Sequence, residues 1–272
     1  MAGAARQATR RAKAPARDPS QVQSLTRALS LLNALAESSD GLALADIAQV
    51  VGLAPSTAHR LLTTMQGQRF VRFIAAEGVW QVGVQAFIVG QSFRRARDVL
   101  AIARPAMRRL MEESGETVNL YIEEGGEAVC MGQVESRQMM RAISRPGGRV
   151  KLHCSGVGKA MLACLPDADV TRILQAHGLP RMTPRTLDTP RKLRADLAGI
   201  RERGFSIDDE EHAIGLRCVA AAIRDEDGLP LAAISLSGPL ARIGDAALIA
   251  SGRLVAAAAD AVTGQLGGRS TR

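Results

Sequence analysis

The chain of 272 residues is long enough for one large domain or two moderate ones, and 46% hydrophobic residues suffice for packed cores. No run approaches the roughly 18 apolar residues of a membrane span, and no apolar stretch follows the basic N-terminus, so we expect a cytoplasmic protein without a signal peptide. The net charge of +8 is compatible with a polyanion partner.

The first segment, residues 1–20, is rich in Ala, Arg and Pro and lacks apolar periodicity. Residues 1–19 carry five basic side chains against one acidic one. We expect a disordered basic tail that can touch phosphate or a minor groove. The alternative is a solubilising tail without specific contacts.

A helix is predicted from Gln23 to Glu37, and its inward residues are expected to be Leu25, Ala28, Leu29, Leu32 and Leu35. The helix is followed by a loop at 38–41 and by a second helix. The second helix ends at Gly52, a residue type that suits a helix C-terminus. A third helix opens at Pro55 and has one apolar and one polar face. The polar face, which suits a DNA major groove, consists of Ser56, Thr57, His59, Arg60 and Thr63. The alternative is an αα-hairpin in an ordinary helical domain.

Two β-branched and aromatic runs, 70–74 and 79–82, flank a turn and predict a β-hairpin directly after the third helix. Three helices and a hairpin make a winged helix-turn-helix over residues 21–84, to whose DNA contacts we add Arg69 and Arg72. Residues 20–84 carry four basic and four acidic side chains. A neutral domain binds DNA weakly by charge alone, so we expect it to depend on dimerisation.

The second half mixes helices and strands in an order typical of an α+β domain with an antiparallel sheet. We expect a linker helix over 85–98, with Arg94, Arg95 and Arg97 on its polar face, and a second domain over 99–268. Pro105 is expected to break or restart the helix there. Strands are predicted at 118–122, 128–134, 139–144, 205–208, 217–224 and 230–237, and helices at 155–165, 169–176, 190–203 and 244–265.

Two motifs in this domain are candidates for ligand binding. The run 153–160 contains Gly158-Lys159, but it lacks the first glycine and the Ser or Thr of a phosphate loop. It instead indicates a helix start near Ser155 whose free N–H groups could hold a carboxylate, or an ordinary cap. Ser235 and Ser237 share one face of a predicted strand, where their hydroxyls would line a pocket or face solvent.

The four cysteines, Cys130, Cys154, Cys164 and Cys218, contain no CxxC pair, so we expect neither a metal site nor another cofactor. In an enzyme, Cys218 would be a nucleophile acting on a small acid with His212 as its base. Nothing in the sequence places these two residues together, and we do not expect an enzyme.

Several of these blocks, in this order, resemble the IclR family of bacterial transcriptional regulators over roughly 22–267. The blocks are 23–25 with 27–29, 52–53 with 56–62, 115–118, 152–154 with 158–160, 215–220 and 235–239. The resemblance implies a winged helix-turn-helix joined by a linker helix to a GAF-like effector domain. It also implies homodimers, paired into homotetramers, on pseudo-palindromic double-stranded DNA in the bacterial nucleoid.

Within the family, the chain looks most like the allantoin-pathway repressors that respond to glyoxylate. Trp80, Gly132-Gln133, Ser155-Gly156 and Ala222 carry this likeness. It implies a repressor modulated by glyoxylate or a related oxo- or ureido acid; an activator or repressor answering an aromatic acid is the alternative. It also implies an effector site formed by Ser155, Gly156, Val157, Asp208, Cys218, Ser235, Leu236 and Ser237.

Overall fold

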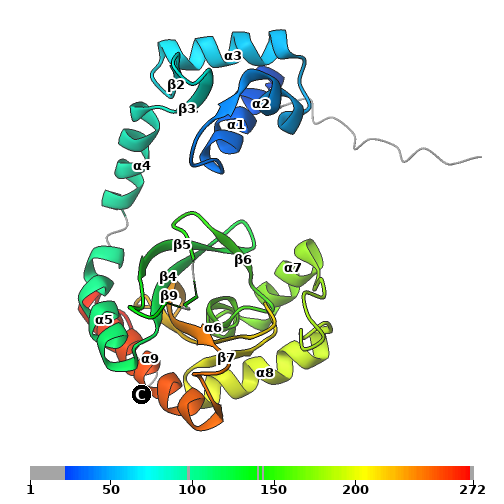
Figure 1. Ribbon diagram of the computed structural model, residues 1–272. Helices are drawn as coiled ribbons and strands as arrows, with labels where there is room; N and C mark the ends of the chain where they lie inside the picture. Colours follow the sequence, from blue (N-terminus) through cyan, green and yellow to red (C-terminus); the bar gives the residue numbers. More distant parts are fainter. Residues whose placement is uncertain (1–21, 97–98, 140, 143, 270–272) are drawn as a thin grey trace, which may run out of the picture. The chain divides into compact units, whose positions relative to one another are not determined.

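A computed structural model of the chain describes residues 22–96, 99–139, 141–142 and 144–269. The chain divides into two compact units, one up to Ala96 and one from Arg97 onward (Figure 1). The predicted basic tail of residues 1–20 and the side chains of Arg94, Arg95 and Arg97 lie outside what the structure describes.

The first unit is a three-helix domain with a small antiparallel sheet. Its helices are α1 (Gln23–Ala36), α2 (Leu44–Val51) and α3 (Pro55–Gly67), and its strands are β1 (Leu42–Ala43), β2 (Val71–Ile74) and β3 (Val79–Val82), in the order β1-β3-β2. Gly52 ends α2 with a φ of 69°, in the left-handed region that glycine tolerates best. The predicted winged helix-turn-helix is therefore confirmed.

The apolar residues of this unit do not all reach its core. Leu31 and Leu35 of α1 are buried with Ile47, Leu62 and Trp80. The prediction that Leu25 and Leu29 also turn inward is wrong, because these side chains are 58% and 50% exposed. Helical periodicity marks an apolar face, but it cannot say whether the same chain covers that face.

The unit continues into α4 (Val84–Ala96), and the second unit begins with α5 (Val99–Ser114). Pro105 lies inside α5 and does not end it, contrary to expectation. α4 also has exposed apolar side chains, which are Val84, Phe87, Ile88 and Val89.

The second unit is built on a six-stranded antiparallel sheet in the order β6-β5-β4-β9-β8-β7. The strands are β4 (Thr117–Glu124), β5 (Glu127–Val134), β6 (Arg149–Lys151), β7 (Ser206–Asp209), β8 (Leu216–Arg224) and β9 (Pro230–Pro239). The strand predicted at 139–144 does not form among the described residues of that segment, and the edge strand lies at Arg149–Lys151. The prediction at 139–144 relied on a short apolar pattern, which is weak evidence for a strand. The three residues of the edge strand are too few to show a periodic pattern of their own.

Helices cover both faces of this sheet (Figure 1). α5 and α9 (Asp245–Gln265) pack on one face, with Val219, Ile234 and Leu236 in the core between them and the sheet. α6 (Gly156–Cys164) packs on the other face against β8 and β9, and α8 (Pro190–Arg203) packs on α6; α7 (Asp167–His177) joins the same core. The predicted α+β architecture is confirmed.

α9 is long and apolar enough to cross a membrane by length and composition alone. Its Val255, Ala259 and Val262 are buried in the core that α5 shares with the sheet. The helix therefore serves here as a core helix, although the sequence was expected to contain no run of that kind.

Candidate functional site

A cavity of about 440 Å³ lies on the α6 side of the second unit's sheet. A volume of this size falls within the range of small-molecule sites in proteins. Seven of the eight predicted effector residues line it, namely Ser155, Gly156, Val157, Asp208, Cys218, Ser235 and Ser237. Its remaining walls are Tyr121, Ala142, Ser144, Arg145, Gly148, Arg149, Val150, His212, Ala213 and Leu216.

Strand register brings the sheet residues of the cavity together. Asp208 of β7 pairs with Cys218 of β8, and Cys218 pairs with Ser237 of β9. Ser235 lies two positions along β9, and because side chains alternate across a strand it points to the same face as Ser237. Residues from three neighbouring strands thus make one polar surface on an otherwise apolar sheet.

Leu236 is the exception among the predicted effector residues. It lies between the two serines, so its side chain points to the opposite face, where it is fully buried against the core of α5 and α9. The assignment of Leu236 to the cavity is therefore wrong for its side chain. The resemblance to relatives assigned residues 235–237 to the site as one block. Because side chains alternate along a strand, Leu236 points away from the face that Ser235 and Ser237 share.

The start of α6 forms the cavity wall that faces this polar surface. Ser155 caps the helix: its hydroxyl accepts a hydrogen bond from the Gly158 N–H at 3.2 Å and donates one to the Lys151 carbonyl at 2.7 Å. A helix N-terminus has further N–H groups and a positive dipole end, which favour an anion. Because its own hydroxyl is occupied by the cap, Ser155 serves this wall chiefly by fixing the helix start.

Two glycines let α6 approach its neighbours closely. A Cβ on Gly158 would lie 2.3 Å from the Leu152 Cα and carbonyl oxygen, which are backbone atoms that cannot yield. A Cβ on Gly156 would lie 2.9 Å from the Cys218 Sγ, the tip of a side chain. The first glycine is thus required for packing, and the second leaves room inside the cavity.

Asp208 is the acidic group of the cavity and is held by a turn at residues 208–212. Its Oδ1 accepts hydrogen bonds from the backbone N–H groups of Glu211, at 2.8 Å, and His212, at 3.2 Å. Burial raises the pKa of Asp208 to about 6, although the nearby Lys159 ammonium opposes this rise. The carboxyl can therefore change its protonation near neutral pH.

Cys218 does not have the properties of a nucleophile. Burial raises the pKa of its thiol to about 12, and the neighbouring Asp208 carboxylate adds to this effect. Attack requires the thiolate, which such a thiol does not supply at neutral pH. His212 lines the same cavity, and burial lowers the pKa of its imidazole, so the ring is neutral there. The two residues line one cavity without forming an activated pair.

The cavity is also lined by residues that the sequence did not reveal. Tyr121 on β4 contributes a phenol whose pKa burial raises above its ordinary value, so it remains a donor. Arg145 and Arg149 bring positive charge, and Arg149 lies 3.4 Å from the Glu127 carboxylate. Tyr121 comes from β4, Arg145 from the segment before β6 and Arg149 from the start of β6, and none of these positions carries a recognisable motif.

The described residues contain no group of three or more His, Cys, Asp or Glu side chains that could hold a metal ion. The buried Cys130 and Cys154 have thiol pKa values that burial raises to about 11 and about 12.

In the first unit, α3 presents most of the predicted DNA-binding residues on one surface. Ser56, His59, Arg60 and Thr63 are exposed, whereas Thr57 is half-buried. The Thr63 hydroxyl donates to the His59 carbonyl at 2.9 Å, so it can offer a DNA base edge only an acceptor. The His59 ring lies edge-on to Trp80, with ring centroids 6.3 Å apart, which ties α3 to the wing.

The wing places Arg69 and Arg72 differently. Arg72 is exposed and donates to the Gln81 side chain at 2.7 Å, across the hairpin. Arg69 is exposed and has a φ of 61°, a left-handed conformation that costs energy in a residue with a Cβ. Its carbonyl oxygen approaches Gly83 so closely that a Cβ there would lie 2.3 Å away, which fixes the path from α3 into the hairpin.

A basic groove beside α3 had no signal in the sequence. Arg27 of α1 and Arg60 of α3 line it together with Gln23, Ser24, Thr57, Leu61 and Thr64. The unit's balanced charge therefore conceals a local pair of arginines among hydrogen-bonding side chains. Helical spacing within α1 could not show which of its faces meets α3.

Comparison with known proteins identifies both units. Residues 24–74 match the family described as "IclR helix-turn-helix domain", and residues 91–263 match "Bacterial transcriptional regulator IclR C-terminal". The "Transcriptional repressor IclR" of Escherichia coli K12 is 50% identical over 250 residues, which cover 91% of each chain. The "HTH-type transcriptional repressor AllR" of the same organism is 41% identical over 245 residues, or 90% of each chain.

Solved structures give the same result at the level of the fold. The IclR of Thermotoga maritima covers 91% of this chain and all of its own, with 27% identity and a TM-score of 0.76. The homologous proteins are transcriptional regulators and not enzymes. The chain is therefore more similar in sequence to this IclR repressor, at 50% identity, than to the AllR relative, at 41%.

Proposed function

The chain belongs to the IclR family and is a DNA-binding transcriptional repressor, and from this premise we propose that a small carboxylate, glyoxylate or a related oxo- or ureido acid, modulates its binding to operator DNA. The cavity on the α6 side of the sheet is the proposed effector site. The observation that carries the proposal is the convergence of the α6 N-terminus with Ser235, Ser237 and Asp208 in one cavity.

The chemistry of that cavity suits an oxo- or hydroxy acid. The first turn of α6 favours a carboxylate, and two hydroxyls and a carboxyl supply hydrogen bonds for a second polar group on the ligand. Arg145 and Arg149 near the opening add positive potential that attracts anions.

An aromatic acid is the second candidate effector, and the size of the cavity favours it. A volume of about 440 Å³ has room for roughly 15 water molecules, whereas a two-carbon acid displaces only a few. The polar lining around Asp208 and the serines favours the smaller, more polar ligand. We therefore place glyoxylate first and retain the larger acid as a comparison ligand.

We propose that the repressor acts as a homodimer, paired into a homotetramer, on a pseudo-palindromic operator. Leu25 and Leu29 of α1, and Val84, Phe87 and Val89 of α4, are each at least 50% exposed. Exposed apolar side chains on two helices of one small domain are unfavourable in water and suit a self-complementary interface. A dimer would double the few DNA contacts that one winged helix-turn-helix domain can make.

The proposed division of labour follows the chain. Residues 21–84 bind DNA through Ser56, Thr57, His59, Arg60, Thr63, Arg69 and Arg72, residues 85–98 form the linker, and residues 99–268 bind the effector. Residues 1–20 form the basic tail. The proposed location is the bacterial cytoplasm, on the nucleoid.

Calorimetry with glyoxylate tests the effector assignment. We expect wild type to bind, and a Ser235→Ala/Ser237→Ala variant to bind at least about tenfold more weakly after losing two hydrogen bonds. A Ser251→Ala variant in α9 is the matched control, because Ser251 is not among the described residues that line the cavity. Equal binding by wild type and the serine variant refutes the assignment, and titration with 4-hydroxybenzoate tests the aromatic alternative.

DNA footprinting upstream of the protein's own gene should show a protected inverted repeat.

A further inference from the structure

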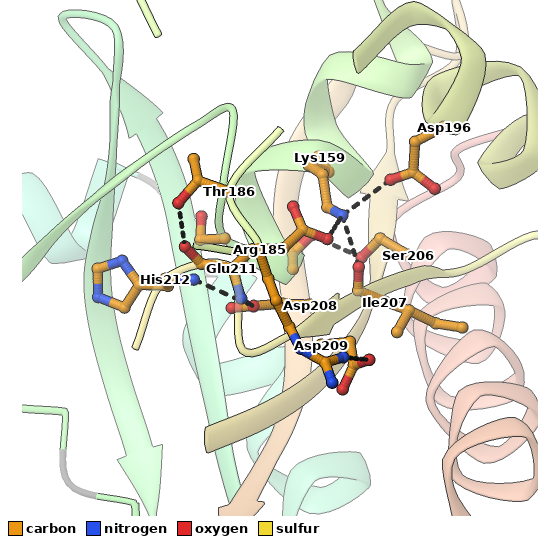
Figure 2. A network of polar contacts seen from close by, with 12 residues as sticks. Lys159, Arg185, Thr186, Asp196, Ser206, Ile207, Asp208, Asp209, Glu211 and His212 are labelled. Carbon is orange, nitrogen blue, oxygen red and sulfur yellow. Dashed lines mark hydrogen bonds and ion pairs between the residues drawn. The ribbon is translucent and has the colours of Figure 1, made fainter. Parts of the chain in front are cut away.

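Lys159, in the middle of α6, is a fully buried cation at the centre of a polar network (Figure 2). Its Nζ donates to the Ile207 carbonyl of β7 at 2.6 Å and forms an ion pair with Asp196 of α8 at 2.8 Å. It also donates to the Glu211 carboxylate. One ammonium group thus joins α6, α8, β7 and the turn at 208–212.

The network is costly to build, so its presence requires an explanation. Buried ion pairs rarely stabilise a protein more than apolar residues of the same size would, because both charges lose their hydration. Burial opposes the charge on Lys159, but Glu211 and Asp196 outweigh this effect and hold its pKa above the ordinary value. A permanent buried ammonium is more readily explained by what it holds in place.

The structure shows that it holds the acidic wall of the effector cavity. Glu211, the partner of Lys159, gives its backbone N–H to Asp208 Oδ1 at 2.8 Å, and Asp208 lines the cavity. Thr186 fixes the same turn from the other side, where its hydroxyl donates to the Glu211 carbonyl at 2.8 Å. Figure 2 shows Asp208 and His212 projecting from the turn that Lys159 and Thr186 hold.

We propose that Lys159 is a positioning residue for the effector site: from outside the cavity, it anchors the 208–212 turn and so places the Asp208 carboxylate where the ligand binds. The proposal rests on the proposed effector function. In this proposal the lysine of the Gly158-Lys159 pair does not bind phosphate. Its buried ammonium group anchors the turn instead. Lys159 is not among the described residues that line the cavity.

The charge on Lys159 also acts on Asp208 directly. Burial raises the pKa of Asp208, Lys159 lowers it, and Asp209 raises it. The other titratable groups in these surroundings are Glu211 and His212 on the turn, Cys218 of β8, and His153 and Cys154 before α6. Removing the ammonium should therefore raise the pKa of Asp208, an effect that a purely mechanical support would not have.

The test uses a variant in which both buried charges disappear. Lys159→Met alone leaves Glu211 without its cation, whereas Asp196 keeps Arg203 at 3.2 Å. This single variant should unfold roughly 6 to 20 °C below wild type. Lys159→Met/Glu211→Gln removes the stranded charge and should recover most of that loss. If this pair does not fold, Lys159→Gln/Glu211→Gln provides the same comparison while retaining a donor for the Ile207 carbonyl.

Two readouts on the double variant decide the matter. In the full-length protein we expect the ¹³C-detected titration midpoint of the Asp208 carboxyl to move upward, and the affinity for glyoxylate to fall at least about tenfold. Glu211→Gln alone is the control, since it leaves Lys159 in place; its Asp208 midpoint should not move upward. Thr186→Val, which loosens the turn without changing charge, should weaken glyoxylate binding with a smaller change in that midpoint.

Recovered stability together with an Asp208 midpoint and a glyoxylate affinity equal to those of Glu211→Gln would overturn the proposal, because Lys159 would then be only a structural ion. Absence of glyoxylate binding by wild type would instead count against the effector assignment. The Asp208 titration is measured without ligand and still decides whether Lys159 acts on that carboxylate.

Discussion

Gly158→Ala should disrupt the effector domain, although alanine normally favours a helix. The new Cβ would lie 2.3 Å from the Leu152 Cα and carbonyl oxygen and 2.6 Å from its carbonyl carbon. Overpacking against atoms that cannot move costs about 3 kcal/mol, and the gain in helix propensity returns about 1 kcal/mol. The expected net loss is therefore about 2 kcal/mol.

A loss of that size corresponds to a decrease of roughly 4 to 8 °C in the unfolding midpoint of a domain of 150–250 residues. Differential scanning calorimetry measures it directly. Gly156→Ala is the matched control in the same helical turn. Its Cβ comes within 3 Å of the Cys218 Sγ alone, at 2.9 Å, and its next contacts are at 3.6 Å, so we expect little loss of stability but weaker glyoxylate binding. A Gly158→Ala protein as stable as wild type would refute the reasoning, since α6 would then have room to move.

Three further changes probe separate parts of the molecule. Leu236→Ala should destabilise the second unit by about 2 to 5 kcal/mol, as judged by urea unfolding, because it empties a fully buried site between the sheet and α5; a loss below about 1 kcal/mol would contradict that placement. Arg27→Ala should reduce the slope of log affinity against log salt by about one in operator binding, if Arg27 reaches a phosphate beside Arg60, and an unchanged slope would exclude the contact. Burial raises the pKa of Glu211 to about 7, so the folded state binds a proton that the unfolded state releases near pH 4.5. Relative to Glu211→Gln, the free energy of unfolding should therefore fall as pH rises from about 4.5 to 7, by at most about 1.4 kcal/mol per pH unit. An increase in the free energy of unfolding over that pH range would contradict this prediction.

Much of the effector cavity could be predicted because strand alternation is a local property. Ser235 and Ser237 share a face wherever β9 lies, and a Ser-Gly-Val-Gly run predicts a helix start in any fold. Asp208 and Cys218 could be placed beside them only through resemblance to relatives, since their contact depends on the pairing of β7 with β8. The same alternation that located the serines should have excluded the side chain of Leu236.

The features that escaped prediction depend on contacts between segments distant in sequence. Arg145 and Arg149 join the cavity through a segment without periodicity, and Arg27 meets Arg60 only because α1 packs on α3. Leu25 and Leu29 carry a helical apolar pattern but remain exposed in a single chain. Periodicity reports that a face is apolar, and only the assembled structure shows what covers it.

We propose that occupancy of the cavity changes operator binding. The most direct test is fluorescence anisotropy of a duplex from upstream of the protein's own gene, titrated with full-length repressor at fixed salt, with and without saturating glyoxylate. For wild type we predict a change in Kd of at least about fivefold, as expected for coupling of 1 kcal/mol or more. The Ser235→Ala/Ser237→Ala variant should bind the duplex equally well in both conditions. The same Kd for wild type with and without glyoxylate would contradict the account.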